Sequence, residues 1–294
     1  MKNKSIYFFL LSLVVLLLYS FEYLYSDVIK LRRFYLGPFI KDYTKLECPK
    51  NPYIIVYFGQ SNSSNTVRPM FLKTKVKSSF QYDWRTKECF KYKEPLLGAN
   101  DFYSNSATPL IAELEKQIQQ KILLVPLGVP GSSILDWSYG NLSKLIDYSL
   151  TNIREQFSES KIVFIFIQGE KDTANKKSEL EEFKQFKRFY HYYPKRNELS
   201  NYSYNLALLN LYKKVHGYFP EALFGIIHST RCNSEKYNPI RQAQKKLAQQ
   251  FENVKILGDL DLVPINKPYR YNGCRLSPKG AKQLSKMILF SLNK

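Results

Sequence analysis

The sequence predicts an α/β protein, a three-layer α/β/α sandwich around a five-stranded, mostly parallel sheet. Two observations lead to this prediction. Apolar strand-like segments alternate with amphipathic helix-like segments from about residue 53 to the C-terminus, and such alternation implies crossover connections with helices on both faces of a sheet. The run at 162–167, Ile-Val-Phe-Ile-Phe-Ile, is apolar at every position, which is typical of a strand buried on both faces.

The individual elements follow from local patterns. We expect strands at residues 53–58, 122–127, 162–167, 222–227 and 254–257. Helical spacing of apolar residues predicts the first helix at 108–120, and further helices are expected at 142–157, 204–218, 239–251 and 278–292. Residues 78–100 show no steady periodicity and are expected to form an ordered surface excursion, and the charged, aromatic segment 175–201 is expected to form helix and loop at the rim of the site.

The N-terminal sequence is typical of an export segment. Lys2 and Lys4 precede an apolar run that begins at Ile6 and extends to about residue 25, close to the roughly 20 residues that cross a bilayer. We expect a hydrophobic helix in residues 1–26 that acts as a signal anchor or a cleaved signal peptide, then a juxtamembrane segment at 27–50 and one domain at 51–294. The domain would lie outside the cytoplasm, in the periplasm or at the cell surface, or be secreted if the segment is cleaved.

The net charge and the cysteines indicate which binding partners and which cellular compartment to expect. The formal net charge is +19, which favours anionic partners, but the lysines are dispersed and no nucleic-acid module is recognisable, so we expect no nucleic-acid partner. Four cysteines suit an oxidising compartment and allow two disulfides in three connectivities. Their places relative to the strands favour the pairs Cys48–Cys89 and Cys232–Cys274. No spacing suggests a zinc site, and we expect no metal or cofactor.

Polar or glycine-rich clusters follow three of the predicted strands: Gly59-Gln60-Ser61-Asn62, Gly128-Val-Pro-Gly131-Ser132-Ser133-Ile134 and Gln168-Gly-Glu170-Lys-Asp172. The carboxyl ends of parallel strands meet at one edge of a sheet, where ligands bind. Ser61 is therefore a candidate nucleophile. The alternative is that Ser61 or Asn62 only caps the following helix, since both residue types are good N-caps.

The three clusters, in this order, resemble the SGNH hydrolases, and more closely their sialate O-acetylesterase-like and carbohydrate acetylesterase branch. The resemblance covers about residue 52 to the C-terminus and implies a flavodoxin-like SGNH fold. It also implies Ser61 as nucleophile and an oxyanion hole formed by the amides of Ser61 and Gly131 and the side chain of Gln168. We expect the neighbouring block residues to bind substrate, namely Gln60, Asn62, Ser132 and Glu170.

The last block departs from the family pattern. The family has an Asp and a His, about three residues apart, after the last strand, and here Asn272 and Arg275 stand at these positions. Arginine stays protonated and cannot accept the serine proton, and asparagine cannot stabilise an imidazolium as a carboxylate does. His228, directly after the fourth strand, is a possible alternative base, with a packed structural histidine as the other interpretation.

Three functions fit these observations. The first is an exported, membrane-anchored serine esterase that removes O-acetyl groups from a glycan despite a degenerate triad. The second is an inactive relative that binds an acylated or acidic glycan, which the replacements at Asn272 and Arg275 and the positive charge favour. The third is an O-acyltransferase, because serine acyl chemistry is the same whether water or a sugar hydroxyl is the acceptor.

Overall fold

The computed structural model describes residues 35–68, 74–173, 201–230, 232 and 240–294. The chain divides into two compact units, Met1–Leu36 and Gly37–Lys294. The N-terminal helix predicted at 1–26 lies outside the described residues, and so does the rim segment predicted at 175–201, except for Asn201. In the ranges that are described, no helix combines the length and apolarity needed to cross a membrane.

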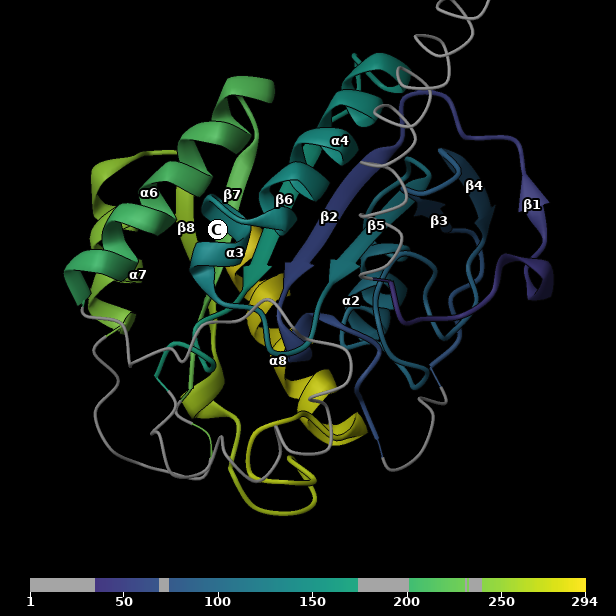
Figure 1. Cartoon of the computed structure of the whole chain (residues 1–294). Coiled ribbons are helices and arrows are strands. Elements are labelled where there is room, and N and C mark those ends of the chain that lie inside the picture. Colours follow the sequence, from purple (N-terminus) through teal and green to yellow (C-terminus); the bar gives the residue numbers. More distant parts are fainter. Residues whose placement is uncertain (1–34, 69–73, 174–200, 231, 233–239) are drawn as a thin grey trace, which may run out of the picture. The chain divides into compact units, whose positions relative to one another are not determined.

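The second unit is built on an eight-stranded sheet in the order β1-β4-β3-β5-β2-β6-β7-β8 (Figure 1). The strands from β3 to β8 in this order run parallel to one another, whereas β4 is antiparallel to β3 and β1 is antiparallel to β4. Their bounds are β1 Lys45–Leu46, β2 Tyr53–Gly59, β3 Phe80–Asp83, β4 Glu88–Lys91, β5 Ile122–Gly128, β6 Ile162–Ile167, β7 Leu223–His228 and β8 Val254–Asp259.

The predicted α/β class and its five parallel strands are confirmed. Every residue of β2, β5 and β6 is buried, as expected of strands covered by helices on both faces. The register places Gly59 opposite both Gly128 and Ile167. The carboxyl ends of the three central strands therefore lie side by side.

The prediction for residues 78–100 is wrong in one respect, because this segment contributes β3 and β4 to the sheet. These strands are only four residues long, and the buried residues of β3 include Gln81 and Asp83, so neither strand shows a continuous apolar run. The Gln81 side chain instead bonds the carbonyls of Lys91 and Lys93, at 3.0 and 3.1 Å. The Cys48–Cys89 disulfide, paired as predicted, ties β4 to the segment after β1.

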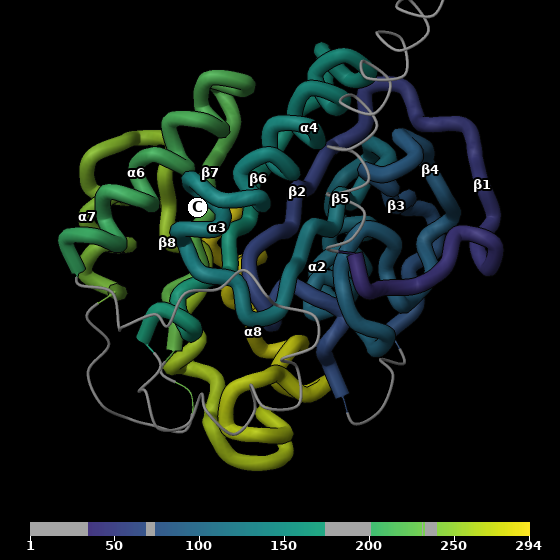
Figure 2. Tube along the Cα trace, viewed as in Figure 1, coloured from purple at the N-terminus to yellow at the C-terminus, as the bar shows by residue number. Residues whose placement is uncertain are grey.

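Helices cover both faces of the sheet (Figures 1 and 2). Helices α2 and α8 pack on one face, and α3, α4, α6 and α7 lie on the other. The five helices predicted between residues 108 and 292 are present, although the first is shorter than expected, and α3 is an additional short helix. Their bounds are α2 Thr108–Leu114, α3 Ile134–Ser138, α4 Asn141–Gln156, α6 Asn201–Tyr218, α7 Ile240–Gln250 and α8 Pro278–Leu292.

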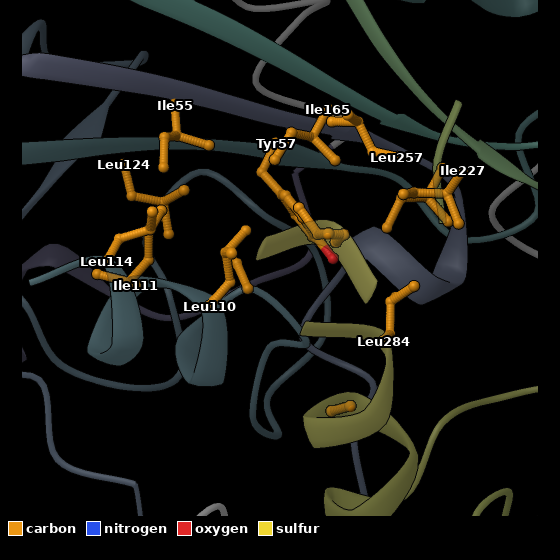
Figure 3. Packing of buried hydrophobic residues seen from close by; sticks show 14 of the residues in the cluster. Ile55, Tyr57, Leu110, Ile111, Leu114, Leu124, Ile165, Ile227, Leu257 and Leu284 are labelled. Atoms are coloured by element: carbon orange, nitrogen blue, oxygen red, sulfur yellow. The ribbon is translucent and has the colours of Figure 1, made fainter. Parts of the chain in front are cut away.

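The core on the α2 and α8 face is aliphatic around Tyr57, as Figure 3 shows. Leu110, Ile111 and Leu114 of α2 and Leu284 of α8 pack against side chains from the strands. The opposite face is aromatic: the ring centroid of Phe58 lies 4.8 Å from that of Phe166 and 5.6 Å from that of Trp137. Burial of these side chains, at about 1.5–3 kcal/mol each, holds the strand ends in place.

Strand β2 ends at a glycine because no side chain fits there. Gly59 has φ +128°, and a Cβ built on it would lie 2.1 Å from the carbonyl oxygen of Ile167 on β6. The polypeptide turns sharply at this point, and the next residues leave the sheet. Close packing of β2 against β6 thus fixes the position of Ser61.

We predict that Gly59→Ala lowers the free energy of unfolding by about 3 kcal/mol or more, because a backbone clash adds to left-handed strain. Gly217→Ala is the matched control. It lies in the last turn of α6, where an added Cβ would meet nothing within 4 Å, and it should change stability by less than about 1 kcal/mol. Urea unfolding measures both, and equal effects would contradict the packing argument.

Candidate functional site

Ser61 begins a short 3-10 turn, η2 (Ser61–Ser63), immediately after β2. Its main chain is held by bonds from Ser64 N and Thr66 Oγ1 to the Ser61 carbonyl, at 3.1 and 2.5 Å. Its side chain makes no hydrogen bond to any residue that the structure describes, and the residue is 6% exposed. Neither Ser61 nor Asn62 caps this turn, whose N-cap is Gln60. The backbone is therefore fixed while the hydroxyl is unengaged.

Two backbone N–H groups at this edge of the sheet are also unengaged. Within the described part of the chain, neither the amide of Ser61 nor that of Gly131 donates a hydrogen bond. Gly131 has φ +73° and is exposed in the turn after β5. Ser132 fixes this turn, because its hydroxyl donates to the Val129 carbonyl at 2.8 Å and accepts from Trp137 Nε1 at 2.8 Å. Free amides in the turns that follow two neighbouring strands are the donor type that stabilises an oxyanion.

The Asn62 side chain joins the Ser61 turn to two other segments. Its Nδ2 donates to Glu170 Oε1 at 2.8 Å and to the Cys274 carbonyl at 3.4 Å. Its Oδ1 accepts the N–H of Leu276 at 3.1 Å. Because Asn62 is 1% exposed, these bonds are made without competition from water. The first and third sequence blocks and the C-terminal loop are thus brought together.

The C-terminal loop places Asn272 and Arg275 beside the Ser61 turn. Residues Arg270 and Leu276 form an isolated antiparallel bridge that closes the loop, and the Cys232–Cys274 disulfide, paired as predicted, ties it to the segment after β7. Asn272 Oδ1 accepts the N–H groups of Cys274 and Arg275, at 3.2 and 2.8 Å. This bond pattern needs only an acceptor oxygen, which an aspartate also has.

Gln168 lies in a buried polar network. Its Nε2 donates to Asp172 Oδ2 at 2.6 Å and to the Ser132 carbonyl at 3.2 Å, and its Oε1 accepts from Tyr204 OH at 2.9 Å. Gln244 also bonds the Gln168 carbonyl at 2.9 Å. Both N–H directions of the Gln168 amide are therefore used within the protein, and its oxyanion role stays a prediction.

Burial raises the pKa of the Asp172 carboxyl from 3.8 to about 6, against hydrogen bonds from Ser133, Ile134 N–H and Gln168 that lower it. Burial likewise raises the pKa of Glu170, and the Asn62 bond and the nearby Arg270 charge only partly offset it. The second oxygen of Glu170 is buried with no hydrogen-bond partner among the described residues. Burial therefore disfavours the ionised form of both carboxyls at the site.

The four residues expected to bind substrate are all buried. Gln60, Asn62, Ser132 and Glu170 are 3%, 1%, 0% and 2% exposed. Their polar atoms bond other parts of the site; Gln60 Oε1, for example, accepts the Lys171 N–H at 3.1 Å. These bonds position the loops, and direct substrate contact by these side chains stays a prediction.

His228 faces a separate group of charges. Its Nδ1 lies 3.8 Å from Asp259 Oδ2 and 3.5 Å from Arg241 Nη2, and Arg241 also pairs with Asp259 and Asp261. Burial opposes ionisation of Asp259, but bonds from His228 and Asp261 N–H and the Arg241 charge hold its pKa below the usual range. No hydrogen bond between described residues joins His228 to Ser61.

Sequence reasoning missed several residues of the site. Arg270 is 1% exposed and donates from Nη2 to the carbonyl of Val263 at 2.9 Å and from Nη1 to Thr230 Oγ1 at 3.1 Å. Tyr204 lies on a helix with no motif to mark it. Two residues carried a signal in the sequence: Asp172 stands in the third block, and Gln244 ends the segment Asn-Pro-Ile-Arg-Gln-Ala-Gln, which also resembles a segment of the family. No group of His, Cys, Asp and Glu side chains in the described ranges is arranged to hold a metal ion.

No family model matches the chain, and no curated protein matches it. Among solved structures, it is similar to a protein from Arabidopsis thaliana, with 15% identity, a TM-score of 0.58, and coverage of 84% of this chain and 99% of that one. A GDSL-like lipase from Parabacteroides merdae has 14% identity, a TM-score of 0.51, and coverage of 85% and 99%. A peptidoglycan O-acetylesterase has 11% identity, a TM-score of 0.45, and coverage of 83% and 91%. At such identities the likeness establishes the fold alone.

We predict that Asn62→Ala lowers the free energy of unfolding by about 2–4 kcal/mol, because it leaves Glu170 and the Leu276 N–H buried without a partner. The control is Asn201→Ala, which removes a solvent-exposed bond to Gln242 and should change stability by less than about 0.5 kcal/mol. Chemical denaturation measures both. A cost for Asn62→Ala as small as that of the control would show that this side chain does not hold the segments together.

We predict that Asp172→Asn removes a pH dependence of stability. The folded-state pKa of Asp172 is raised from 3.8 to about 6, so the folded chain binds the proton more tightly than the unfolded chain. Protonation of Asp172 therefore stabilises the folded chain. This contribution to the free energy of unfolding is fully present below about pH 4 and is lost as the pH rises through about 6, a change of roughly 3 kcal/mol.

Urea unfolding of the parent chain and of Asp172→Asn between about pH 4 and pH 7 tests this. The stability of the variant relative to the parent should rise across that interval. A difference that is constant with pH would mean that Asp172 titrates as it does in the unfolded chain.

Proposed function

We propose that this chain is a serine carbohydrate esterase with a weakened proton-transfer step, which acts on an O-acyl ester of a glycan. The observation that carries the proposal is the unengaged Ser61 hydroxyl at a strand end where two backbone amides, those of Ser61 and Gly131, have no hydrogen-bond partner among the described residues. Attack on an ester carbonyl needs these two elements, a nucleophile and fixed donors for the developing oxyanion.

The reaction has two steps. Ser61 Oγ bonds to the carbonyl carbon, the serine proton is released, and the sugar oxygen leaves as an alcohol after it takes up a proton. Water then adds to the acyl-serine carbonyl and releases the carboxylic acid and the free serine. If a second sugar hydroxyl replaces water in this step, the same residues catalyse acyl transfer.

Proton transfer is the weak point of this mechanism. In the described residues Ser61 has no basic partner, and the position of the family His holds Arg275, whose side chain donates to Tyr271 OH at 3.1 Å. General-base catalysis contributes about 10²- to 10⁴-fold to such reactions. Slow turnover is therefore expected. The same replacement supports a second candidate function, binding of an acylated or acidic glycan without turnover.

We further propose that the domain works outside the cytoplasm, anchored by residues 1–26 or secreted after their removal. The basic flank and apolar run of the sequence support this location. The two disulfides also support it, because structural disulfides persist in oxidising compartments.

We predict that the parent chain labels slowly with a fluorophosphonate probe and hydrolyses 4-nitrophenyl acetate slowly, and that Ser61→Ala abolishes both. The double variant Asn272→Asp with Arg275→His restores a base and its orienting carboxylate. It should raise the hydrolysis rate by about 10²-fold or more. Probe labelling and absorbance at release of nitrophenolate are the measurements.

Two controls sharpen the result. Labelling of Ser61→Ala at the parent rate would show that another residue reacts with the probe. If the parent chain neither labels nor turns over while the double variant does, this protein is not an esterase and the binding function stands. His228→Ala should leave the parent rate unchanged, since the His228 ring nitrogen faces Asp259 and Arg241; loss of activity would identify it as a relocated base.

A further inference from the structure

Two arginines converge on one tyrosine at the edge of the Ser61 site. The guanidinium of Arg68 lies over the ring of Tyr271, 4.6 Å from its centroid, and over the ring of Tyr103, at 5.1 Å. Arg275 Nη1 donates to the hydroxyl of the same Tyr271 at 3.1 Å. We call these four residues the arginine cluster. All four are partly exposed, so the cluster is open to a ligand.

Neither arginine of the cluster has an acidic partner among the residues that the structure describes. None of the ion pairs found there involves Arg68 or Arg275. Asp101, which is close in sequence to Tyr103, accepts the N–H of Phe102 at 2.9 Å with its carboxylate. Two like charges held on one aromatic residue repel each other, and an oxyanion between them would relieve that repulsion.

The backbone on either side of Arg275 is bonded to the Ser61 turn, and Arg68 follows that turn along the chain. Arg275 lies between Cys274 and Leu276, whose main-chain atoms bond the side chain of Asn62. Arg68 follows the Ser61 turn by a few residues, and a bridge between Val67 and Ser104 fixes its approach to Tyr103. The two guanidiniums thus come from segments far apart in the sequence that the fold brings to the same tyrosine.

We propose that Arg68 and Arg275 form an anion subsite, which binds the oxyanion of an acidic sugar while the O-acyl group of that sugar lies at Ser61. The proposal rests on the esterase function above and adds the substrate class, a uronic acid or a sulfated sugar. Guanidinium forks match carboxylate and sulfate oxygens in bidentate geometry. Tyr103 and Tyr271 are both partly exposed, and aromatic side chains pack well against apolar surfaces such as the face of a sugar.

Replacement of the triad histidine by Arg275 then has a positive role. A cation at this position binds the substrate through a charge that a neutral imidazole lacks, at the expense of the general base. The replacement lowers the rate of turnover and gives selectivity for acidic over neutral glycans. Such selectivity depends on charge pairs in a partly exposed site and should weaken as salt is added.

The test measures binding in the full-length chain with Ser61→Ala, so that no ligand is consumed. Isothermal titration calorimetry compares three matched sugars that each carry one O-acetyl group: a methyl glucuronide, a methyl glucoside and a methyl glucoside 6-sulfate. We expect the glucuronide, the sulfate or both to bind about tenfold more tightly than the neutral glucoside at low salt. The acidic sugar that binds more tightly shows whether the subsite prefers a carboxylate or a sulfate.

Charge-removing variants then locate the effect. In the Ser61→Ala chain, Arg68→Gln and Arg275→Gln should each reduce the preference by about fivefold or more. Arg154→Gln is the control, because Arg154 also lies over a tyrosine ring, that of Tyr218, at 5.1 Å, but on α4 outside the site. Thermal unfolding of each variant checks that the fold is retained, and Arg275→Lys should keep part of the preference.

Several outcomes overturn the proposal. Equal binding of acidic and neutral sugars would do so, as would a preference that survives both arginine variants or falls equally with Arg154→Gln. Absence of binding by all three sugars at about 10 mM, where even very weak complexes form, also rejects it. Hydrolysis of the neutral ester 4-nitrophenyl acetate tests the esterase function independently of the anion subsite. Failure of the subsite and failure of the esterase function can therefore be told apart.

Discussion

The site depends on how closely β2 and β6 approach at their carboxyl ends. With Gly59 packed against the carbonyl of Ile167, the chain leaves the sheet at a fixed point and in a fixed direction. Gln60 N–H then bonds the same Ile167 carbonyl at 2.9 Å. Everything that follows, from the Ser61 turn to the Asn62 bonds, is positioned by this contact between two fully buried strands.

Buried polar groups do the rest of the positioning, at a cost. Gln168, Asp172, Tyr204 and Gln244 bond one another between the sheet and the helices on one face. Carboxyls kept away from water favour their protonated form, and unsatisfied atoms remain at Glu170 and Arg270 among the described residues. Such a network is stabilising only when nearly complete, which explains why so many side chains near Ser61 bond the protein and so few are free for a ligand.

The parts of the fold that could be predicted are those with continuous apolar signals. The five parallel strands and their helices follow from runs such as Ile162–Ile167, and the disulfide pairs follow from their places beside those strands. The hairpin of β3 and β4 could not be predicted, because its strands are short and its buried residues include Gln81 and Asp83. Its stability comes from pairing with β5, which local sequence does not encode. The site shows the same division. Ser61, Gly131, Asn272 and Arg275 stand in contiguous sequence blocks, whereas Tyr103 and Tyr204 carry no motif and reach the site only through folding over long distances along the chain. Arg68 is close to Ser61 in sequence but also carries no motif.

The way Asn62 holds the C-terminal loop has an evolutionary consequence. It bonds a carbonyl and an N–H of the loop backbone, so the anchoring does not depend on which side chains stand at 272 and 275. Substitution there can therefore change the side chains that the loop presents, one codon at a time, while the loop stays attached to the Ser61 turn and keeps its own bonds wherever an acceptor oxygen remains at 272.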